Sequence, residues 1–91
     1  MAIVEDGRKV LSDCISSQVD KHAIYGGVVP EIASRCHVEA IAYLAGQALK
    51  EAGISKNEID AVAVTYAPGL LGALLVGVNF AKSCAFELGV P

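Results

Sequence analysis

The longest apolar stretch of the chain runs from Ala61 to Leu88, and its first 21 residues carry no charge. Ala61 to Tyr66 is short and rich in β-branched and aromatic residues, which predicts a buried strand. Pro68-Gly69 interrupts the run, because proline lacks a backbone donor and glycine adopts angles that other residues avoid. The pattern therefore predicts a strand followed by a tight glycine loop.

From Leu70 the apolar positions continue for about five helical turns, and Gly89 stands where a helix C-terminus often takes a left-handed residue. We expect a buried helix over residues 70–88. A membrane-spanning helix is the alternative interpretation. From Leu70 to the first charge at Lys82 there are only 12 residues, whereas a span needs about 20, so we expect no membrane insertion.

The N-terminal region predicts a β-hairpin. Two β-prone runs, Ala2 to Glu5 and Lys9 to about Gln18, flank Asp6-Gly7, a dipeptide that tolerates the positive φ angles of a two-residue turn. The hairpin begins almost at residue 1, as though a segment upstream had been removed. Residues 19–30 form a connection containing Gly26-Gly27, which fits an ordinary loop or a loop at the rim of a site.

A long helix is predicted from about Pro30 to Ala52, ending at Gly53. Proline suits the first helical position, where its missing donor would be unpaired anyway. Apolar residues recur at helical spacing along one broad stripe that we expect to be buried: Ile32, Ala33, Cys36, Ala40, Ile41, Leu44, Ala48 and Leu49.

Polar positions on and after this helix carry only weak signals. Glu31, Arg35 and Glu39 lie at four-residue steps and can pair along one edge. His37 falls near that edge as a surface or capping residue, because no second metal ligand stands at helical spacing from it. Ser55 and Glu58 have the spacing of a capping box.

Composition adds a few limits. Hydrophobic residues make up 54% and aromatic residues 5%, so the core should be aliphatic. The net charge is −3 and the sequence has no basic cluster, so the composition does not indicate nucleic-acid binding. Three separated cysteines without a C-x-x-C pair favour reduced thiols. The N-terminus shows no signal or transit pattern. We therefore expect a cytoplasmic location.

The order strand, strand, helix, strand, helix predicts an α/β fold with a right-handed crossover and a partly parallel sheet. Ligands of such sheets bind beyond the carboxyl ends of the strands, which here is the loop Thr65 to Leu71. A glycine loop before a helix N-terminus is suited to holding an anion. The Walker pattern is absent, however, and Pro-Gly more often marks a plain tight turn. The candidate substrate-binding residues are Ala67, Pro68, Gly69 and Leu70.

Two segments together resemble a known family. GGVVPEIASRCHVEAI (26–41) and DAVAVTYAPGLLGALLVGVNFAKSCAFELGVP (60–91) are similar to the N-terminal region of the universal tRNA threonylcarbamoyltransferases. These proteins were formerly called O-sialoglycoprotein endopeptidases, or the glycoprotease family. The resemblance covers essentially the whole chain.

The resemblance implies a partial N-terminal domain, residues 1–91, of a larger two-domain protein with an actin-like, sugar-kinase-like ATPase fold. The family transfers a threonylcarbamoyl group from an adenylate intermediate to the adenosine next to the anticodon in tRNA. It binds a divalent metal, zinc or iron, and ATP or threonylcarbamoyl-adenylate. Its metal-binding histidines and nucleotide loops would follow Pro91, so we expect no cofactor, no metal ligand and no catalytic residue in this chain, and no activity from it alone.

The family's first strand would precede Ala2 and lie centrally in a mixed sheet that carries two packed helices. Its absence should leave a gap between the hairpin and residues 61–66. The resemblance also implies a paralogous subunit docked on helices 30–52 and 70–88, and tRNA bound through the complete complex. We expect that helix contact surface to consist of small or apolar residues: Ala40, Leu44, Ala48, Ala73, Gly77 and Ala81.

Two other functions stay open at this point. The chain could belong to a non-catalytic paralogue, since such partner subunits share a Ser-Arg-x-His helix and a Pro-Gly loop, although GGVVPE favours the catalytic branch. It could also be a nucleotide-binding kinase-like module, which the lack of a phosphate-loop lysine disfavours. A peptidase has no support, because no Ser or Cys is matched with a His and an acid in a recognisable arrangement.

Overall fold

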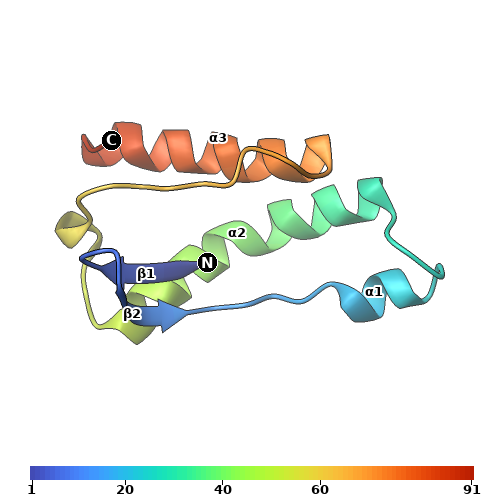
Figure 1. The fold of residues 1–91 in the computed structure, drawn as a ribbon, viewed down its shortest axis with the longest axis horizontal. Coiled ribbons are helices and arrows are strands. Elements are labelled where there is room, and N and C mark those ends of the chain that lie inside the picture. The colour runs from blue at the N-terminus through green and yellow to red at the C-terminus, as the bar shows by residue number, and fades with distance from the viewer.

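The computed structural model describes all residues 1–91 and shows an α/β arrangement of one hairpin and three helices (Figure 1). The elements in chain order are β1 (Ala2–Glu5), β2 (Lys9–Asp13), α1 (Val19–Ala23), α2 (Pro30–Ala52), the 3₁₀ turn η1 (Lys56–Glu58) and α3 (Leu71–Leu88). The long helix α2 packs against both the hairpin and α3. The Ser12 hydroxyl on β2 donates a buried hydrogen bond of 2.8 Å to the carbonyl of Ala48, which ties the hairpin to α2.

The hairpin turns at the predicted Asp6-Gly7 pair, and both residues have positive φ, 53° and 70°, which this dipeptide tolerates. Glu5 pairs with Lys9, so three residues lie between the paired strand ends rather than the predicted two. The second strand is shorter than predicted, because it ends at Asp13 rather than Gln18. The last backbone bond of the pair runs from the Cys14 N–H to the carbonyl of Met1 at 2.7 Å. Helix α1 follows within the stretch predicted to be a connection.

Helix α2 confirms the prediction for residues 30–52. Pro30 occupies its first turn, and Gly53 ends it in the left-handed conformation, where glycine carries no Cβ penalty. Of the predicted stripe, Ala33, Cys36 and Ala48 are buried, and the remaining residues are half-buried. The capping box after α2 is also present, with the Ser55 N–H donating to the Glu58 carboxylate at 2.7 Å.

The predicted strand at residues 60–66 is wrong, and so is the partly parallel sheet. The only sheet is the antiparallel pair β1–β2, while residues 61–66 run in extended form beside α3 without a ladder (Figure 1). A strand requires a neighbour for its backbone groups, and β1 pairs only with β2. The only backbone bond that residues 61–66 make joins the Val62 N–H to the carbonyl of Pro91 at 2.8 Å. The expected gap between the hairpin and residues 61–66 is therefore present.

Helix α3 confirms the predicted bounds within one residue, and it stops at Gly89 in the left-handed conformation. Its predicted burial is wrong, because Ala81 is its only buried residue. Leu71 is 73% exposed and Phe86 is 90% exposed. With 18 residues and a mean hydropathy of 1.4, α3 is long and apolar enough to cross a membrane by length and composition alone.

A large apolar cleft accompanies the low burial of the chain. It lies between β1, α2, residues 61–65 and α3, and it has a volume of about 1060 Å³. The six residues expected on a docking surface line this central cleft instead, namely Ala40, Leu44, Ala48, Ala73, Gly77 and Ala81. They line the cleft because α2 packs against both the hairpin and α3, and the cleft lies between these elements. The outer faces of the two helices carry other apolar side chains, among them Val38, Tyr43, Leu71, Leu75 and Phe86.

Candidate functional site

The four candidate residues Ala67, Pro68, Gly69 and Leu70 form one exposed loop between the extended segment and α3. The peptide bond between Ala67 and Pro68 is cis. Leu70, which is 39% exposed, is the residue that caps α3. The loop thus lies at the N-terminus of an 18-residue helix, as the sequence predicts, but at the end of an unpaired segment rather than of a strand.

The N-terminus of α3 has no side-chain cap. Leu70 is extended, with φ −69° and ψ 123°, and its carbonyl accepts the first helical bond from the Leu74 N–H at 2.9 Å. The N–H groups of the first turn have no partner inside the helix, and they carry the positive end of the helix dipole. The loop can therefore present several backbone donors to an anion or to a carbonyl oxygen.

Gly69 lets this loop close tightly on the helix. A Cβ at Gly69 would lie 3.3 Å from the side chain of Leu74, one turn into α3. A side chain there would have to displace Leu74, so glycine at this position keeps the loop in contact with the first turn.

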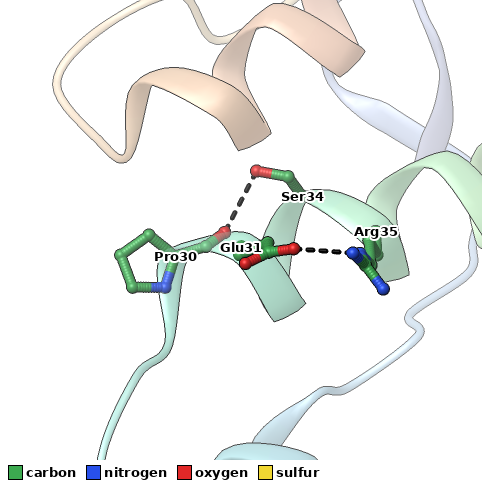
Figure 2. Close-up of polar contacts among 4 residues, drawn as sticks. All are labelled: Pro30, Glu31, Ser34 and Arg35. Carbon is green, nitrogen blue, oxygen red and sulfur yellow. Dashed lines mark hydrogen bonds and ion pairs between the residues drawn. The ribbon is translucent and has the colours of Figure 1, made fainter.

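The N-terminal ends of α2 and α3 meet at Ser34 and Gly72. The Ser34 hydroxyl donates to the carbonyl of Pro30 at 3.0 Å, and Figure 2 shows the side chain between the first turn of α2 and the ribbon of α3. A Cβ on Gly72 would overlap with Ser34 Oγ. Glycine at position 72 therefore permits the approach that brings the loop beside the start of α2.

One ion pair lies beside this contact. The Arg35 guanidinium donates to the Glu31 carboxylate at 2.6 Å (Figure 2). Both side chains are about three-quarters exposed, 73% and 74%, so the pair contributes only a few tenths of a kcal/mol. Glu39, which was expected to pair along the same edge, makes no ion pair. Arg35 is the cation nearest in sequence to Ser34, and it remains accessible at the solvent face.

His37 was predicted to be a surface or capping residue, and the structure gives it a different environment. It is half-buried, and its Nδ1 lies 3.0 Å from Nε2 of Gln18. Oε1 of the same glutamine lies 3.3 Å from Nε2 of His22. These three side chains line one end of the central cleft. Sequence reasoning missed this contact, although Gln18 and His22 stand four residues apart around a short helix, a spacing that favours contact between side chains.

The cysteines do not form a shared site. All three are free thiols. The Cys14 thiol donates to the Glu51 carboxylate at 3.2 Å, and burial, followed by this bond and the negative charge of Glu51, raises the pKa of Cys14. No three His, Cys, Asp or Glu side chains lie together as a metal site would require, so residues 1–91 do not fit a bound divalent metal.

Comparisons with known proteins give one consistent result. A sequence model described as "tRNA N6-adenosine threonylcarbamoyltransferase" matches residues 9–91. Proteins named tRNA N6-adenosine threonylcarbamoyltransferase are similar to 99% of the chain at 57% identity in Caldicellulosiruptor bescii and at 54% identity in Syntrophotalea carbinolica. A relative of the same name in Fusobacterium nucleatum is 54% identical over the whole chain. The chain spans about a quarter of the length of these curated relatives, 26–27%.

Proposed function

Because the chain belongs to the tRNA N6-adenosine threonylcarbamoyltransferase family, we propose that it supplies one part of an enzyme that transfers threonylcarbamoyl from an adenylate to the tRNA adenosine next to the anticodon. The observation that carries this proposal is the match of residues 9–91. It includes the loop at residues 67–70 and the start of both long helices. The non-catalytic paralogue has no comparable support.

The role proposed for the loop is to hold an anionic or carbonyl oxygen of the adenylate. The uncapped first turn of α3 offers backbone N–H groups, and such donors stabilise negative charge without reorganising. Ser34 and Gly72 hold this turn against α2, so the donors are fixed in place. Positioning of this kind supports group transfer by keeping the reacting groups aligned.

Metal chemistry is assigned to other parts of the protein. The family resemblance implies a divalent metal, zinc or iron, together with ATP or threonylcarbamoyl-adenylate. Residues 1–91 bring no three metal-ligating side chains together, so they take part in the reaction through backbone donors and side-chain hydrogen bonds rather than through a metal of their own. The chain on its own is proposed to be inactive.

The central cleft supports the proposed actin-like fold. It separates β1, which has one unpaired edge, from the unpaired residues 61–66. An additional strand between them would satisfy both sets of backbone groups. We assign this place to the family's first strand, which would convert the two segments and the hairpin into one mixed sheet within the N-terminal domain of a two-domain protein.

The outer faces of α2 and α3 are proposed to dock a paralogous subunit, with tRNA bound by the complete complex in the cytoplasm. Tyr43 on α2 is 70% exposed, and on α3 Leu71 and Phe86 are 73% and 90% exposed. Exposed apolar side chains of this size support a protein contact surface, because a monomer seldom leaves large apolar patches open to solvent. Membrane insertion of α3 is not part of this proposal.

A substitution at Leu70 tests the loop. In the full-length enzyme, Leu70→Asp places a carboxylate at the N-cap, where it accepts bonds from the first-turn N–H groups and stabilises α3 by about 1 kcal/mol. The same carboxylate occupies and repels the site of the substrate oxygen. We expect threonylcarbamoyl transfer to tRNA to fall at least about tenfold, since about 1.4 kcal/mol of lost binding has that effect, while the melting temperature is unchanged or higher.

Leu70→Asn is the matched control, because asparagine caps the helix without a negative charge. We expect it to retain more activity than Leu70→Asp at equal stability. Full activity of Leu70→Asp would refute the role of the loop, and absence of transfer activity in the unmodified enzyme with its partner subunit would refute the function itself.

A further inference from the structure

Helix α1 is only weakly held on the rest of the chain. None of its residues is buried, and its first residue, Val19, is 71% exposed. Two side-chain contacts join α1 and its N-cap Gln18 to residues within α2. Gln18 Nε2 lies 3.0 Å from Nδ1 of His37, and the Lys21 Nζ donates to the Cys36 Sγ at 3.5 Å. An element with so little apolar burial opens at a low free-energy cost.

The second of these contacts joins an amine to a thiol. Lys21 is exposed and makes no ion pair with a carboxylate, so the Cys36 sulfur is the only side-chain partner of its nitrogen. Cys36 itself is 8% exposed. Thiols beside a lysine have the electropositive surroundings in which cysteine reacts most readily. Each opening of α1 removes the lysine from Cys36 and lets a small oxidant reach the sulfur.

The other two thiols have different surroundings. The Cys14 thiol donates to the Glu51 carboxylate at 3.2 Å, and burial, followed by this bond and the charge of Glu51, raises the pKa of Cys14. A thiol that stays protonated is a poor nucleophile. Cys84 is half-buried and has no lysine nitrogen within hydrogen-bond distance. Cys36 is therefore the one thiol of the chain with an amine in contact.

We propose that Lys21 and Cys36 form a reversible covalent clasp between α1 and α2 when the protein meets a hydroperoxide such as hydrogen peroxide. In the first step the Cys36 sulfur takes one oxygen from the peroxide. The sulfur is oxidised to a sulfenic acid, and the peroxide is reduced to water.

In the second step the Lys21 nitrogen attacks the oxidised sulfur. An S–N bond forms and the S–O bond breaks. The hydroxyl group leaves with one ammonium proton as water, and a second ammonium proton goes to solvent. Sulfenic acids condense with backbone nitrogen in the same way to give a sulfenamide. A dithiol reverses the link, because it reduces the sulfur to the thiol, releases the amine and becomes a disulfide itself.

Peptide mass spectrometry of the full-length protein tests the link. The protein is treated with hydrogen peroxide, then alkylated and digested with trypsin, which cuts after lysine and arginine. Without the clasp, residues 10–21, 22–35 and 36–50 separate. The clasp blocks the cut after Lys21. We expect residues 10–35 joined to residues 36–50, with a mass lower by two hydrogens than the sum of the two peptides, and their separation by dithiothreitol.

The digest also distinguishes the clasp from a disulfide. A disulfide between Cys14 and Cys36 leaves Lys21 free, so it would join residues 10–21 to residues 36–50, and this result would overturn the proposal. Cys14→Ser should keep the clasp. Lys21→Arg is the matched control, because arginine keeps the positive charge but is not deprotonated in proteins. In that variant Cys36 should gain oxygen without any link.

Three results would refute the clasp. They are joined peptides that persist in Lys21→Arg, a Cys36 that stays reduced, and a Cys36 in the unmodified protein that gains oxygen without linking.

Amide hydrogen exchange tests what the clasp does. In the oxidised protein the amides of residues 19–23 should exchange more slowly, dithiothreitol should restore the original rate, and Lys21→Arg should show neither change. Equal exchange in the linked and unlinked protein would show that the bond does not hold α1, and would overturn this role. Neither measurement uses transfer to tRNA, so the outcome is independent of the proposed function.

Discussion

The contact between Ser34 and Gly72 gives a quantitative test of how the two long helices are held together. In Gly72→Ala the new Cβ would overlap with Ser34 Oγ. Either the helices separate, or the Ser34 hydroxyl rotates and gives up its 3.0 Å bond to Pro30. Overpacking of this kind costs about 1–3 kcal/mol, and the bond is worth about 0.5–1.5 kcal/mol.

The gain in helix propensity offsets part of that cost. Replacing glycine by alanine inside a helix is worth about 1 kcal/mol, so the expected net destabilisation of Gly72→Ala is up to about 2 kcal/mol. In a domain of this size each kcal/mol lowers Tm by about 4–8 °C. Gly46→Ala is the matched control, because a Cβ there meets nothing within 4 Å in the middle of α2. It should raise Tm.

A double-mutant cycle separates the clash from other effects. Ser34→Ala removes the atom that a Cβ at Gly72 would meet, so the pair Ser34→Ala/Gly72→Ala should be more stable than the sum of its single changes by about 1–2 kcal/mol. The measurement is thermal unfolding followed by far-UV circular dichroism. Additive effects within about 0.3 kcal/mol would refute the reasoning, because residues in contact are expected to couple more strongly than that.

Three further predictions concern other parts of the chain. The raised pKa of Cys14 means that the folded chain favours the neutral thiol. The contribution of Cys14 to stability should therefore be constant below the ordinary thiol pKa and should be lost as pH rises through the folded value. Glu51→Gln, measured by thermal unfolding across pH, should weaken that loss. Gly53→Ala forces alanine into the left-handed region at φ 70° and should destabilise the protein by about 1–2 kcal/mol, whereas Gly46→Ala should stabilise it. Stability changes of the same sign in the two variants would contradict this prediction. Phe86→Ser should leave Tm within about 2–4 °C of the value for the unmodified protein, because substitutions at exposed sites change stability by no more than about 0.5 kcal/mol. If the outer face of α3 is a contact surface, the same substitution should reduce self-association in light scattering.

The helices and the turn could be predicted because their signals are local. Pro30 and Gly53 mark the two ends of α2, and Gly89 marks the end of α3. Asp6-Gly7 likewise determines the hairpin turn through backbone angles of adjacent residues. Each of these signals acts within one or two turns of chain, so the sequence alone was enough.

The strand at residues 60–66 and the burial of α3 could not be predicted, because both depend on distant parts of the chain. An extended, apolar run becomes a strand only beside another strand, and β1 does not reach it. The apolar side chains of α3 indicated a buried helix, but burial needs a surface on the other side, and the central cleft is open there.

The position of the candidate loop was predicted, while its role in binding stays a prediction. Ala67 to Leu70 follow from a glycine loop before a helix, and the structure places them at that helix terminus. Ser34 and Gly72 meet only through the packing of α2 on α3, and spacing along the chain contains no information on that packing. The link from Gln18 to His37 joins two different segments, so it was missed for the same reason.

The bond from the Val62 N–H to the carbonyl of Pro91 joins the two ends of the segment that contains α3. The segment begins with the extended residues 61–66, continues through the loop and α3, and ends at Pro91, next to Val62 again. It is therefore suited to open and close as one cooperative unit, separately from the hairpin. Amide hydrogen exchange at Val62 would report the opening of this unit. Its protection should rise and fall together with that of the α3 amides, while the amides of β1 and β2 follow their own rate.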